Sequence, residues 1–501
     1  MQIPLITDPD EVFSEIKTDF EKIQEATIQN PFPSWKERLS LLERLEKLVV
    51  ENQDAISEAI NTDFGHRSAL QTEMLDVLPL LNHIRLLKRK AKNWMRPRFH
   101  FADALFLPAH SLMMAQPKGI IGIISPWNYP LLLSMGPVAY VFASGNRCMV
   151  KLSEFAPVFA DLIKKLVAKY FRPDEMCIIT GDEQIASRFT SLPFDHLIFT
   201  GSSSVGKKVM TMASSNLVPV TLELGGKSPV LITPNYPLRH AAERVLFAKL
   251  LNSGQTCIAP DYVLIEHRAI PRFLGLLQEI GREFYPNGIH ENDYTSIANR
   301  THFERILNQL QQASMSSKIY PIFSGEQVDM VKRKIAPQVV TNPMLNESLM
   351  QEEIFAPVLP IVAYPDGKVE EALDFINSRP HALAFYLFDN DKKRIEDILR
   401  KTKCGGVTIN DALWHATQST LPFGGVGHSG MGSWTGKTGF DSLSHFKPVF
   451  YQSRFSMVSL LNPPYSSQIR QFIKKQITAK KTKKIQLILK FLKGLTQKNK
   501  E

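Results

Sequence analysis

Cysteine is scarce in this chain, with four residues in a length of 501. So few thiols argue against a disulfide framework and favour a reducing compartment. Long apolar runs are also missing, since none reaches the roughly 18 to 20 residues that cross a bilayer. The first residues carry acids early and lack the basic start and apolar core of a signal peptide. We therefore predict a cytoplasmic protein whose thiols stay free.

The sequence also lacks internal repeats and low-complexity stretches, and its segment 199–206 does not have the Gly-x-Gly-x-x-Gly spacing of dinucleotide sites. Its 44% hydrophobic and 22% charged residues are typical of a soluble globular protein. A length of 501 residues is too great for one ordinary core. We expect at least two domains.

Acidic residues are nearly absent from residues 462–501, which contain eleven Lys or Arg and one acid, Glu501. This tail accounts for the whole net charge of +10, so the body is neutral and the charge does not predict a nucleic-acid binder. Apolar residues follow helical spacing within it, at Ile485, Ile488, Leu489, Leu492 and Leu495. Such a basic amphipathic helix either lies peripherally on an anionic membrane surface or packs its apolar stripe on the body.

The body alternates short apolar runs with helix-length segments. A helical pattern covers residues 34–62, and after Arg98 the predicted strands are 120–125, 149–152, 176–180, 197–200 and 218–224. A second series follows at 228–233, 262–267, 358–362, 385–388 and 407–410. Strands separated by helical crossovers predict an α/β protein with parallel sheets covered on both faces.

Gly, Ser and charged residues gather where the first strands end, the edge at which such sheets bind ligands. Lys151 and Glu154 end one strand, Gly181 follows another, and residues 199–206 lead from a third into a helix. The last segment includes Gly201, Ser202, Val205 and Gly206, and can present backbone N–H groups and a helix N-terminus to a pyrophosphate. Together these features favour a dinucleotide.

One thiol stands out. Cys257 lies in the small-residue segment Ser253–Cys257, thirty-four residues after Glu223, which precedes a pair of glycines. The other cysteines, Cys148, Cys177 and Cys404, have no neighbouring residues suited to chemistry and are interpreted as structural. A thiol nucleophile and a carboxylate that activates water predict covalent oxidation of a carbonyl, followed by hydrolysis of a thioester. We predict no metal site.

Several segments resemble the aldehyde dehydrogenases in order and spacing, and the match covers residues 30–465. They are 126–130, 199–206, 222–229, 254–257, 352–355 and 422–425. Residues 254–264 are similar to the class 3 branch, and residues 63–68 and 125–130 to the bacterial coniferyl aldehyde dehydrogenases. This resemblance implies a Rossmann-type NAD-binding domain, a second α/β catalytic domain and a small β oligomerisation extension.

The resemblance implies domain limits as well. They are an NAD-binding domain at 1–222, with 98–116 in the oligomerisation extension, a catalytic domain at 223–405, a return to the cofactor domain with an oligomerisation strand at 406–461, and the tail at 462–501. It also implies a homodimer.

The resemblance further implies roles for individual residues. Cys257 attacks the aldehyde, Glu223 activates water, and Asn128 donates its amide to the oxyanion. The cofactor residues it implies are Trp127, Lys151, Glu154, Gly181, Gly201, Ser202, Val205, Gly206, Leu224, Glu353 and Phe355.

The cofactor and the reaction retain alternatives. Glu154 disfavours a ribose 2′-phosphate, so NAD is the predicted cofactor, with NADP as the alternative. Coniferyl aldehyde and medium or long aliphatic aldehydes both suit an apolar funnel. Two rival functions are a CoA-acylating dehydrogenase, which Glu223 argues against, and a non-catalytic membrane-surface binding protein on the same fold.

Overall fold

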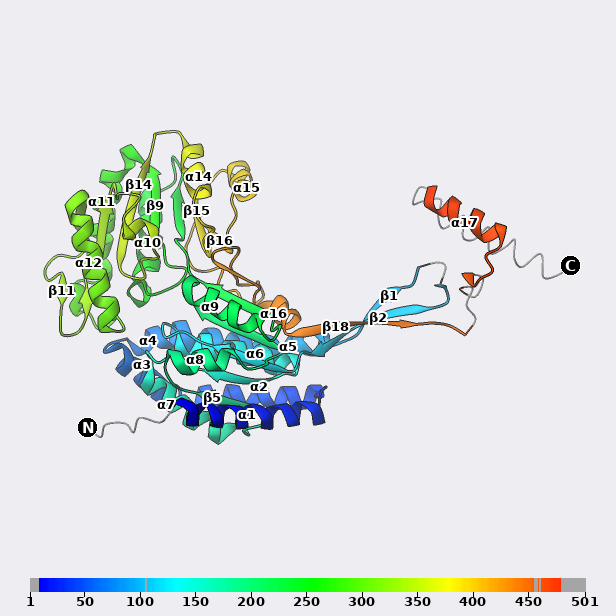
Figure 1. Ribbon diagram of the computed structural model, residues 1–501. Coiled ribbons are helices and arrows are strands. Elements are labelled where there is room, and N and C mark those ends of the chain that lie inside the picture. The colour runs from blue at the N-terminus through cyan, green and yellow to red at the C-terminus, as the bar shows by residue number, and fades with distance from the viewer. Residues whose placement is uncertain (1–8, 104–105, 455–457, 459–460, 479–501) are drawn as a thin grey trace. The chain divides into compact units, whose positions relative to one another are not determined.

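The computed structural model describes residues 9–103, 106–454, 458 and 461–478. The chain forms two compact units. The first contains residues 1–92 and 117–444, and the second contains residues 93–116 and 445–501. Figure 1 shows the elements of both.

A six-stranded sheet organises the N-terminal half of the first unit. Its strand order is β17-β7-β6-β3-β4-β5, and only β17 runs antiparallel to its neighbour. The strands are β3 (Ile120–Ile124), β4 (Arg147–Lys151), β5 (Met176–Ile179), β6 (His196–Gly201), β7 (Val220–Leu224) and β17 (Gly430–Met431). The order reverses between β3 and β6, as in doubly wound dinucleotide-binding folds, so the predicted Rossmann-type domain is confirmed.

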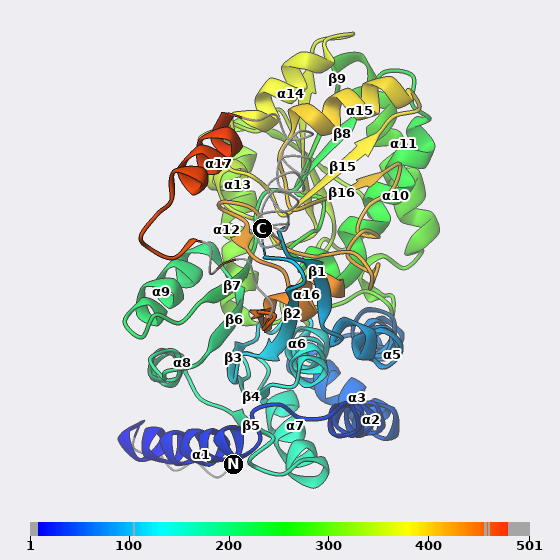
Figure 2. The ribbon, with the colours of Figure 1, turned by 90° about the vertical axis from the view of Figure 1, so that its right-hand side faces the viewer.

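Helices cover both faces of this sheet (Figure 2). On one face lie α1 (Pro9–Gln29), α8 (Glu183–Thr190) and α9 (Ser203–Ser214). On the other lie α2 (Trp35–Glu51), α3 (Gln53–Phe64), α6 (Pro130–Ser144) and α7 (Pro157–Tyr170). Since both faces are covered, β3 has all five residues buried and contains four isoleucines, which is typical of a central parallel strand.

A seven-stranded sheet organises the second half of the first unit. Its order is β10-β13-β14-β9-β8-β15-β16, parallel except for β10. The strands are β8 (Pro229–Ile232), β9 (Tyr262–Glu266), β10 (Lys318–Pro321), β13 (Gln338–Thr341), β14 (Val358–Tyr364), β15 (Ala384–Phe388) and β16 (Gly406–Ile409). A two-stranded sheet pairs β11 (Val328–Asp329) with β12 (Lys334–Ile335). The predicted second α/β sheet is confirmed.

Two clusters of side chains bury the faces of this second sheet. One contains apolar residues of α10 (Leu238–Leu250) and α11 (Ile270–Phe284), and the other those of α14 (Val369–Asn377) and α15 (Lys392–Lys401). The remaining helices of the first unit are α4 (Ala69–Thr72), α5 (Leu78–Trp94), α12 (Arg300–Ser316), α13 (Ser348–Gln351), α16 (Gly436–Ser442), and the short turns η1 (Glu73–Val77), η3 (Leu251–Gly254), η4 (His267–Ala269) and η5 (Gly288–His290).

The predicted single helix over 34–62 was wrong in one respect. Asn52 separates α2 from α3, with non-helical angles of φ −127° and ψ 17°. Its Nδ2 donates to the Leu48 carbonyl at 2.7 Å. An Asn side chain that bonds the backbone in this way competes with the helix, and the apolar periodicity does not register the break.

The second unit contains a three-stranded sheet and one helix. The sheet has the order β1-β2-β18, from β1 (Arg98–Phe101), β2 (His110–Pro117) and β18 (Ser444–Tyr451), and the helix is α17 (Ser467–Thr478). The predicted apolar stripe from Ile485 to Leu495 lies outside the described residues. None of the described helices is long and apolar enough to cross a bilayer.

The sheets also locate the segments around the predicted domain limits. β16 joins the second sheet, whereas β17 joins the first. The limits at 222/223 and 405/406 stay predictions.

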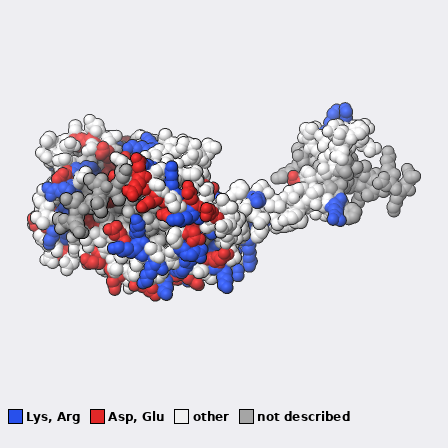
Figure 3. Space-filling view, turned by 60° about the horizontal axis from the view of Figure 1, so that its bottom comes forward, with Lys and Arg blue, Asp and Glu red and all other residues white. Residues whose placement is uncertain are grey.

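The face of the larger unit in Figure 3 shows acidic and basic side chains interspersed.

Candidate active site

A cavity of about 790 Å³ lies at the carboxyl ends of β3, β6 and β7. It brings together predicted residues from distant parts of the chain. They are Trp127, Asn128, Gly201, Ser202, Glu223, Leu224, Cys257, Glu353 and Phe355. A thiol, two carboxyl groups and an amide thus share one cavity.

Five predicted cofactor residues lie outside the lining of this cavity: Lys151, Glu154, Gly181, Val205 and Gly206. Lys151 is buried, and its Nζ lies 3.0 Å from Glu154 Oε2, whose side chain is 40% exposed. Gly206 packs against β7, because a Cβ there would lie 2.6 Å from Leu224 Cδ2. Ser202 is the N-cap of α9 and accepts from the Val205 N–H at 3.4 Å.

The thiol loop has a strained backbone. Asn252, Ser253 and Gly254 have φ of 52°, 52° and 74°, the left-handed region that side chains disfavour. Gly254 is required for a second reason, because a Cβ there would lie 2.4 Å from the Ala356 carbonyl oxygen. Strain of this kind persists only when surrounding contacts hold it.

Gln255 supplies such contacts. It is fully buried, and its Nε2 donates to the carbonyls of Asn252 at 2.9 Å and Ser296 at 3.0 Å. Its Oε1 accepts from the Ala298 N–H at 2.9 Å. The side-chain amide therefore pins the loop two residues before Cys257.

The Cys257 thiol lies in this cavity beside two carboxyl groups. Burial raises its pKa, and the charges of Glu353 and Glu223 raise it further. A thiol in these surroundings stays protonated at neutral pH. It becomes a nucleophile only when a neighbouring group takes its proton.

Glu223 lies on β7, opposite Gly430 of β17. Its side chain is buried, and neither carboxyl oxygen has a hydrogen-bond partner among the described residues. Burial raises its pKa well above the usual value. An unpartnered carboxyl group of raised pKa is suited to accept a proton from water or from a thiol.

Asn128 follows β3 and is buried. Its Nδ2 donates to the Gln255 carbonyl at 3.1 Å, which fixes one of its two N–H groups. The backbone carbonyl of Asn128 accepts from Asn252 Nδ2 at 3.1 Å. The cavity-lining amide is thus tied to the loop that contains the thiol.

Glu353 and Phe355 reach the cavity from the loop between α13 and β14. A Cβ at Gly225 would overlap the Glu353 carboxyl group, so the glycine leaves room for it. Phe355 has a φ of 52°, and its ring lies 5.6 Å from that of Trp127. Burial raises the pKa of Glu353 to about 8, and the charge of Asp261 adds to this.

This shift predicts how stability depends on pH. Because the folded-state pKa of Glu353 exceeds the ordinary 4.5, its stabilising contribution is complete below about pH 4.5 and is lost as pH rises through about 8. Glu353→Gln cannot ionise at this position, so it escapes this loss of stability. The Tm of the variant minus the Tm of the wild type should therefore increase by several degrees from pH 5 to pH 8.5. Thermal unfolding of both proteins across that range is the measurement, and parallel Tm curves would contradict the assignment.

The structure adds residues that sequence reasoning missed. His302 and Arg305 of α12 line the cavity, and the His302 ring lies 5.1 Å from that of Trp127. Burial lowers the pKa of His302 to about 4, so its ring is neutral at pH 7. Arg379 also lines the cavity. These residues occur in helix or loop patterns with no chemical signature, so only the fold reveals them.

Comparison with known proteins identifies the family of this chain. A model of the aldehyde dehydrogenase family matches residues 15–449, so the fold and sequence define an NAD(P)-dependent oxidoreductase of aldehydes. The chain belongs to the aldehyde dehydrogenase family, and it oxidises an aldehyde to the carboxylic acid.

Two curated relatives are bacterial. A probable coniferyl aldehyde dehydrogenase of Pseudomonas aeruginosa is 40% identical over 92% of this chain and 96% of its own length. A coniferyl aldehyde dehydrogenase of a Pseudomonas species (strain HR199) is 39% identical over 91% of this chain and 95% of its own. Among solved structures, Staphylococcus aureus AldH in a substrate-bound state has a TM-score of 0.87 and 34% identity, covering 92% of this chain and 99% of that one.

Proposed function

We propose that this dehydrogenase acts on aromatic propenals such as coniferyl aldehyde, with NAD as preferred cofactor and Cys257, Glu223 and Asn128 as catalytic residues. The observation that carries the assignment of residues is their meeting in one cavity. The names of the curated relatives support the substrate class. Medium and long aliphatic aldehydes are the alternative substrates.

The chain's own groups account for the steps before and after hydride transfer. Glu223, whose oxygens lack partners among the described residues, takes a proton from the thiol or from water. The sulfur of Cys257 forms a bond to the aldehyde carbon, and the aldehyde oxygen becomes negatively charged. This oxygen accepts hydrogen bonds from the Asn128 side-chain amide and the Cys257 backbone N–H. After oxidation, water activated by Glu223 attacks the thioester carbon, the carbon–sulfur bond breaks, and the acid leaves.

NAD(P) supplies the hydride acceptor when it is bound. The residues present fit it in two ways. The buried Glu353 Oε1 has no partner among the described residues and lies in the cavity, where a ribose hydroxyl would satisfy it. The turn from Gly201 into α9 exposes a helix N-terminus, which suits a pyrophosphate.

The choice between NAD and NADP rests on Glu154. Its half-exposed carboxylate accepts from a ribose hydroxyl and repels a 2′-phosphate, whereas Lys151 at 3.0 Å offsets part of that repulsion. We infer a preference for NAD rather than complete exclusion of NADP.

The test is NADH formation with coniferyl aldehyde, hexanal and a long-chain aldehyde, with NAD or NADP and with or without CoA. The proposal expects the highest kcat/KM for coniferyl aldehyde with NAD, and turnover that needs no CoA. Turnover only with CoA would assign a CoA-acylating enzyme. No NADH formation with any of the aldehydes, although NAD binds, would favour the non-catalytic alternative.

We further propose a homodimer in the cytoplasm. The three-stranded sheet of the second unit supports the dimer, because it exposes large apolar side chains. They are Phe99, Phe101, Phe450 and Tyr451. The small number of cysteines supports a reducing compartment. Sedimentation equilibrium tests the dimer, and a monomer would contradict it.

Peripheral contact with a membrane is proposed for the basic tail. Within α17, Ile473 and Ile477 are exposed beside Lys474 and Lys475, which supports contact with an anionic surface. The full chain should cosediment with phosphatidylglycerol vesicles at low salt and not with phosphatidylcholine vesicles. Replacing Lys480, Lys481, Lys483 and Lys484 with Gln should release it, and unchanged sedimentation would contradict the proposal.

A further inference from the structure

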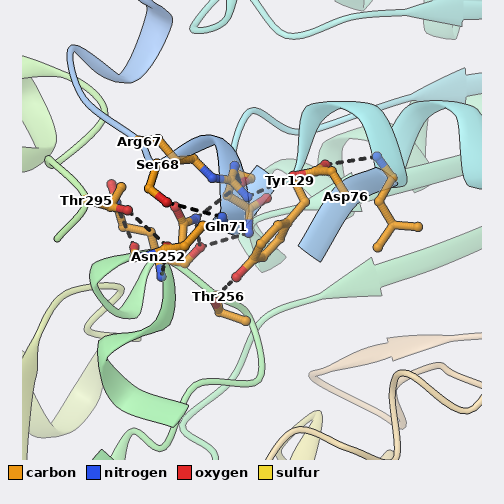
Figure 4. Close-up of polar contacts among 11 residues, drawn as sticks. Arg67, Ser68, Gln71, Asp76, Tyr129, Asn252, Thr256 and Thr295 are labelled. Carbon is orange, nitrogen blue, oxygen red and sulfur yellow. Dashed lines mark hydrogen bonds and ion pairs between the residues drawn. The ribbon is translucent and has the colours of Figure 1, made fainter. Parts of the chain in front are cut away.

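A buried ion pair lies directly behind the cavity. Arg67 Nη2 and Asp76 Oδ2 are 2.8 Å apart, and both side chains are 0% exposed. Arg67 lies between α3 and α4, and Asp76 lies in the π-helical turn η1 that precedes α5. Figure 4 shows the pair among its neighbours. Neither residue lines the cavity.

The pair holds the segment that contains Asn128 at several points. Arg67 Nη1 donates to the Asn128 backbone carbonyl at 3.2 Å, and Asp76 Oδ1 accepts from the Leu132 N–H at 3.0 Å. The Arg67 guanidinium also lies 5.2 Å from the centre of the Tyr129 ring. One cation and one anion thus fix the backbone on both sides of Tyr129.

A second set of contacts joins the same region to the thiol loop. Gln71 Oε1 accepts from the Asn252 N–H at 3.2 Å and from Thr295 Oγ1 at 3.0 Å. Asn252 Nδ2 donates to the same Asn128 carbonyl that Arg67 binds, and the Tyr129 hydroxyl is hydrogen-bonded to Thr256 Oγ1 (Figure 4). The amide and the thiol are therefore held by one continuous network.

Stability alone does not account for this ion pair. Removing two charges from water costs free energy that an apolar pair of similar volume would avoid. Arg67 Nε adds to the cost, because it is buried and has no hydrogen-bond partner among the described residues. The charged pair makes directional hydrogen bonds that an apolar pair cannot make. These bonds hold the Asn128 carbonyl and the Leu132 N–H at defined distances.

We propose that Arg67 and Asp76 are positioning residues that orient Asn128 for the reaction. With its backbone carbonyl fixed by Arg67 and one amide N–H fixed by Gln255, the Asn128 side chain has one N–H left for the aldehyde oxygen. This inference rests on the proposed role of Asn128 as oxyanion donor. It adds that the donor functions only while the buried pair holds the segment.

The experiment is a double-mutant cycle with NAD and the aldehyde that gives the highest wild-type kcat/KM. Arg67→Met and Asp76→Asn are made in the wild type and in Asn128→Ala. In the wild type each should lower kcat roughly 10- to 100-fold, with KM for NAD unchanged, because small displacements of a donor cost about this much. In Asn128→Ala each should lower kcat less than about 2-fold further, because the group being positioned is gone.

The control is a second ion pair at a distance from the cavity lining. Arg44 and Glu175 are joined by two contacts of 2.8 Å. Glu175→Gln should lower Tm and leave kcat unchanged. Arg67→Lys keeps the charge with a shorter reach, so it should fold and recover part of the kcat lost in Arg67→Met. This variant decides the question if Arg67→Met fails to fold.

Three outcomes would overturn the inference. Equal losses of kcat in both backgrounds would mean that the pair acts independently of Asn128. Full kcat in Arg67→Met and Asp76→Asn would mean that the pair positions nothing. Full kcat in Asn128→Ala would remove the donor itself and defeat the proposed role of Asn128, whereas the first two results leave that role standing.

Discussion

Cys257→Ala should abolish aldehyde oxidation, with kcat lower by at least about 10⁴-fold. No other side chain in the cavity lining carries a thiol, the most nucleophilic of these groups near neutral pH, so no equivalent group can form the bond to the aldehyde carbon. NAD should still bind, because the residues proposed to hold it are unchanged. NADH formation at 340 nm and NAD binding by calorimetry are the two measurements.

Cys404→Ala is the matched control for this loss. Cys404 is also a free, partly buried cysteine, and its thiol donates to the Gly406 carbonyl at 3.5 Å. Its removal should leave kcat within about 2-fold of the wild type, as expected for a residue that touches no reacting atom. If Cys257→Ala retained substantial turnover, covalent catalysis at this thiol would be wrong.

Glu223→Gln should separate the two halves of the reaction. If Glu223 activates the water that clears the thioester, the variant forms about one NADH per site and then nearly stops. The expected loss in steady-state kcat is about 10² to 10⁴-fold, the usual contribution of a general base. Rapid-mixing absorbance measures the burst, and intact-protein mass measures the acyl group left on the enzyme.

The control for Glu223 is Glu266→Gln, which removes another buried carboxylate from the end of β9. It should change Tm and give no burst, because Glu266 is not in the cavity lining. Normal steady-state turnover in Glu223→Gln would contradict the proposed role. Loss of the burst as well would show that Glu223 also takes the proton of the thiol.

Much of the fold follows from local sequence patterns. The buried run Ile120–Ile124 appears as a strand because parallel strands covered on both faces are continuously apolar. The break at Asn52 escaped prediction, since a side chain bonded to the preceding turn interrupts a helix without changing its apolar periodicity. Patterns report burial well and local hydrogen bonds poorly.

Some residues of the candidate site can likewise be predicted from sequence motifs, and others cannot. Cys257, Glu223 and Gly254 stand in short motifs whose residue types carry the chemistry, so their candidacy can be predicted from the sequence. His302 and Arg305 have no such motif and reach the cavity only because α12 packs beside it. The raised pKa of Glu353 likewise depends on burial, which no motif specifies.

By itself, the sequence determined the class of protein, the two parallel sheets and the chemical types of the principal site residues, because these depend on residue identity and periodicity. Only the tertiary structure decided how Asn128 contacts the loop that contains Cys257 and that Arg67 and Asp76 lie behind it. These contacts join segments more than fifty residues apart along the chain. Distances and burial between such segments are set by the packing of whole helices and sheets, so no short stretch of sequence contains them.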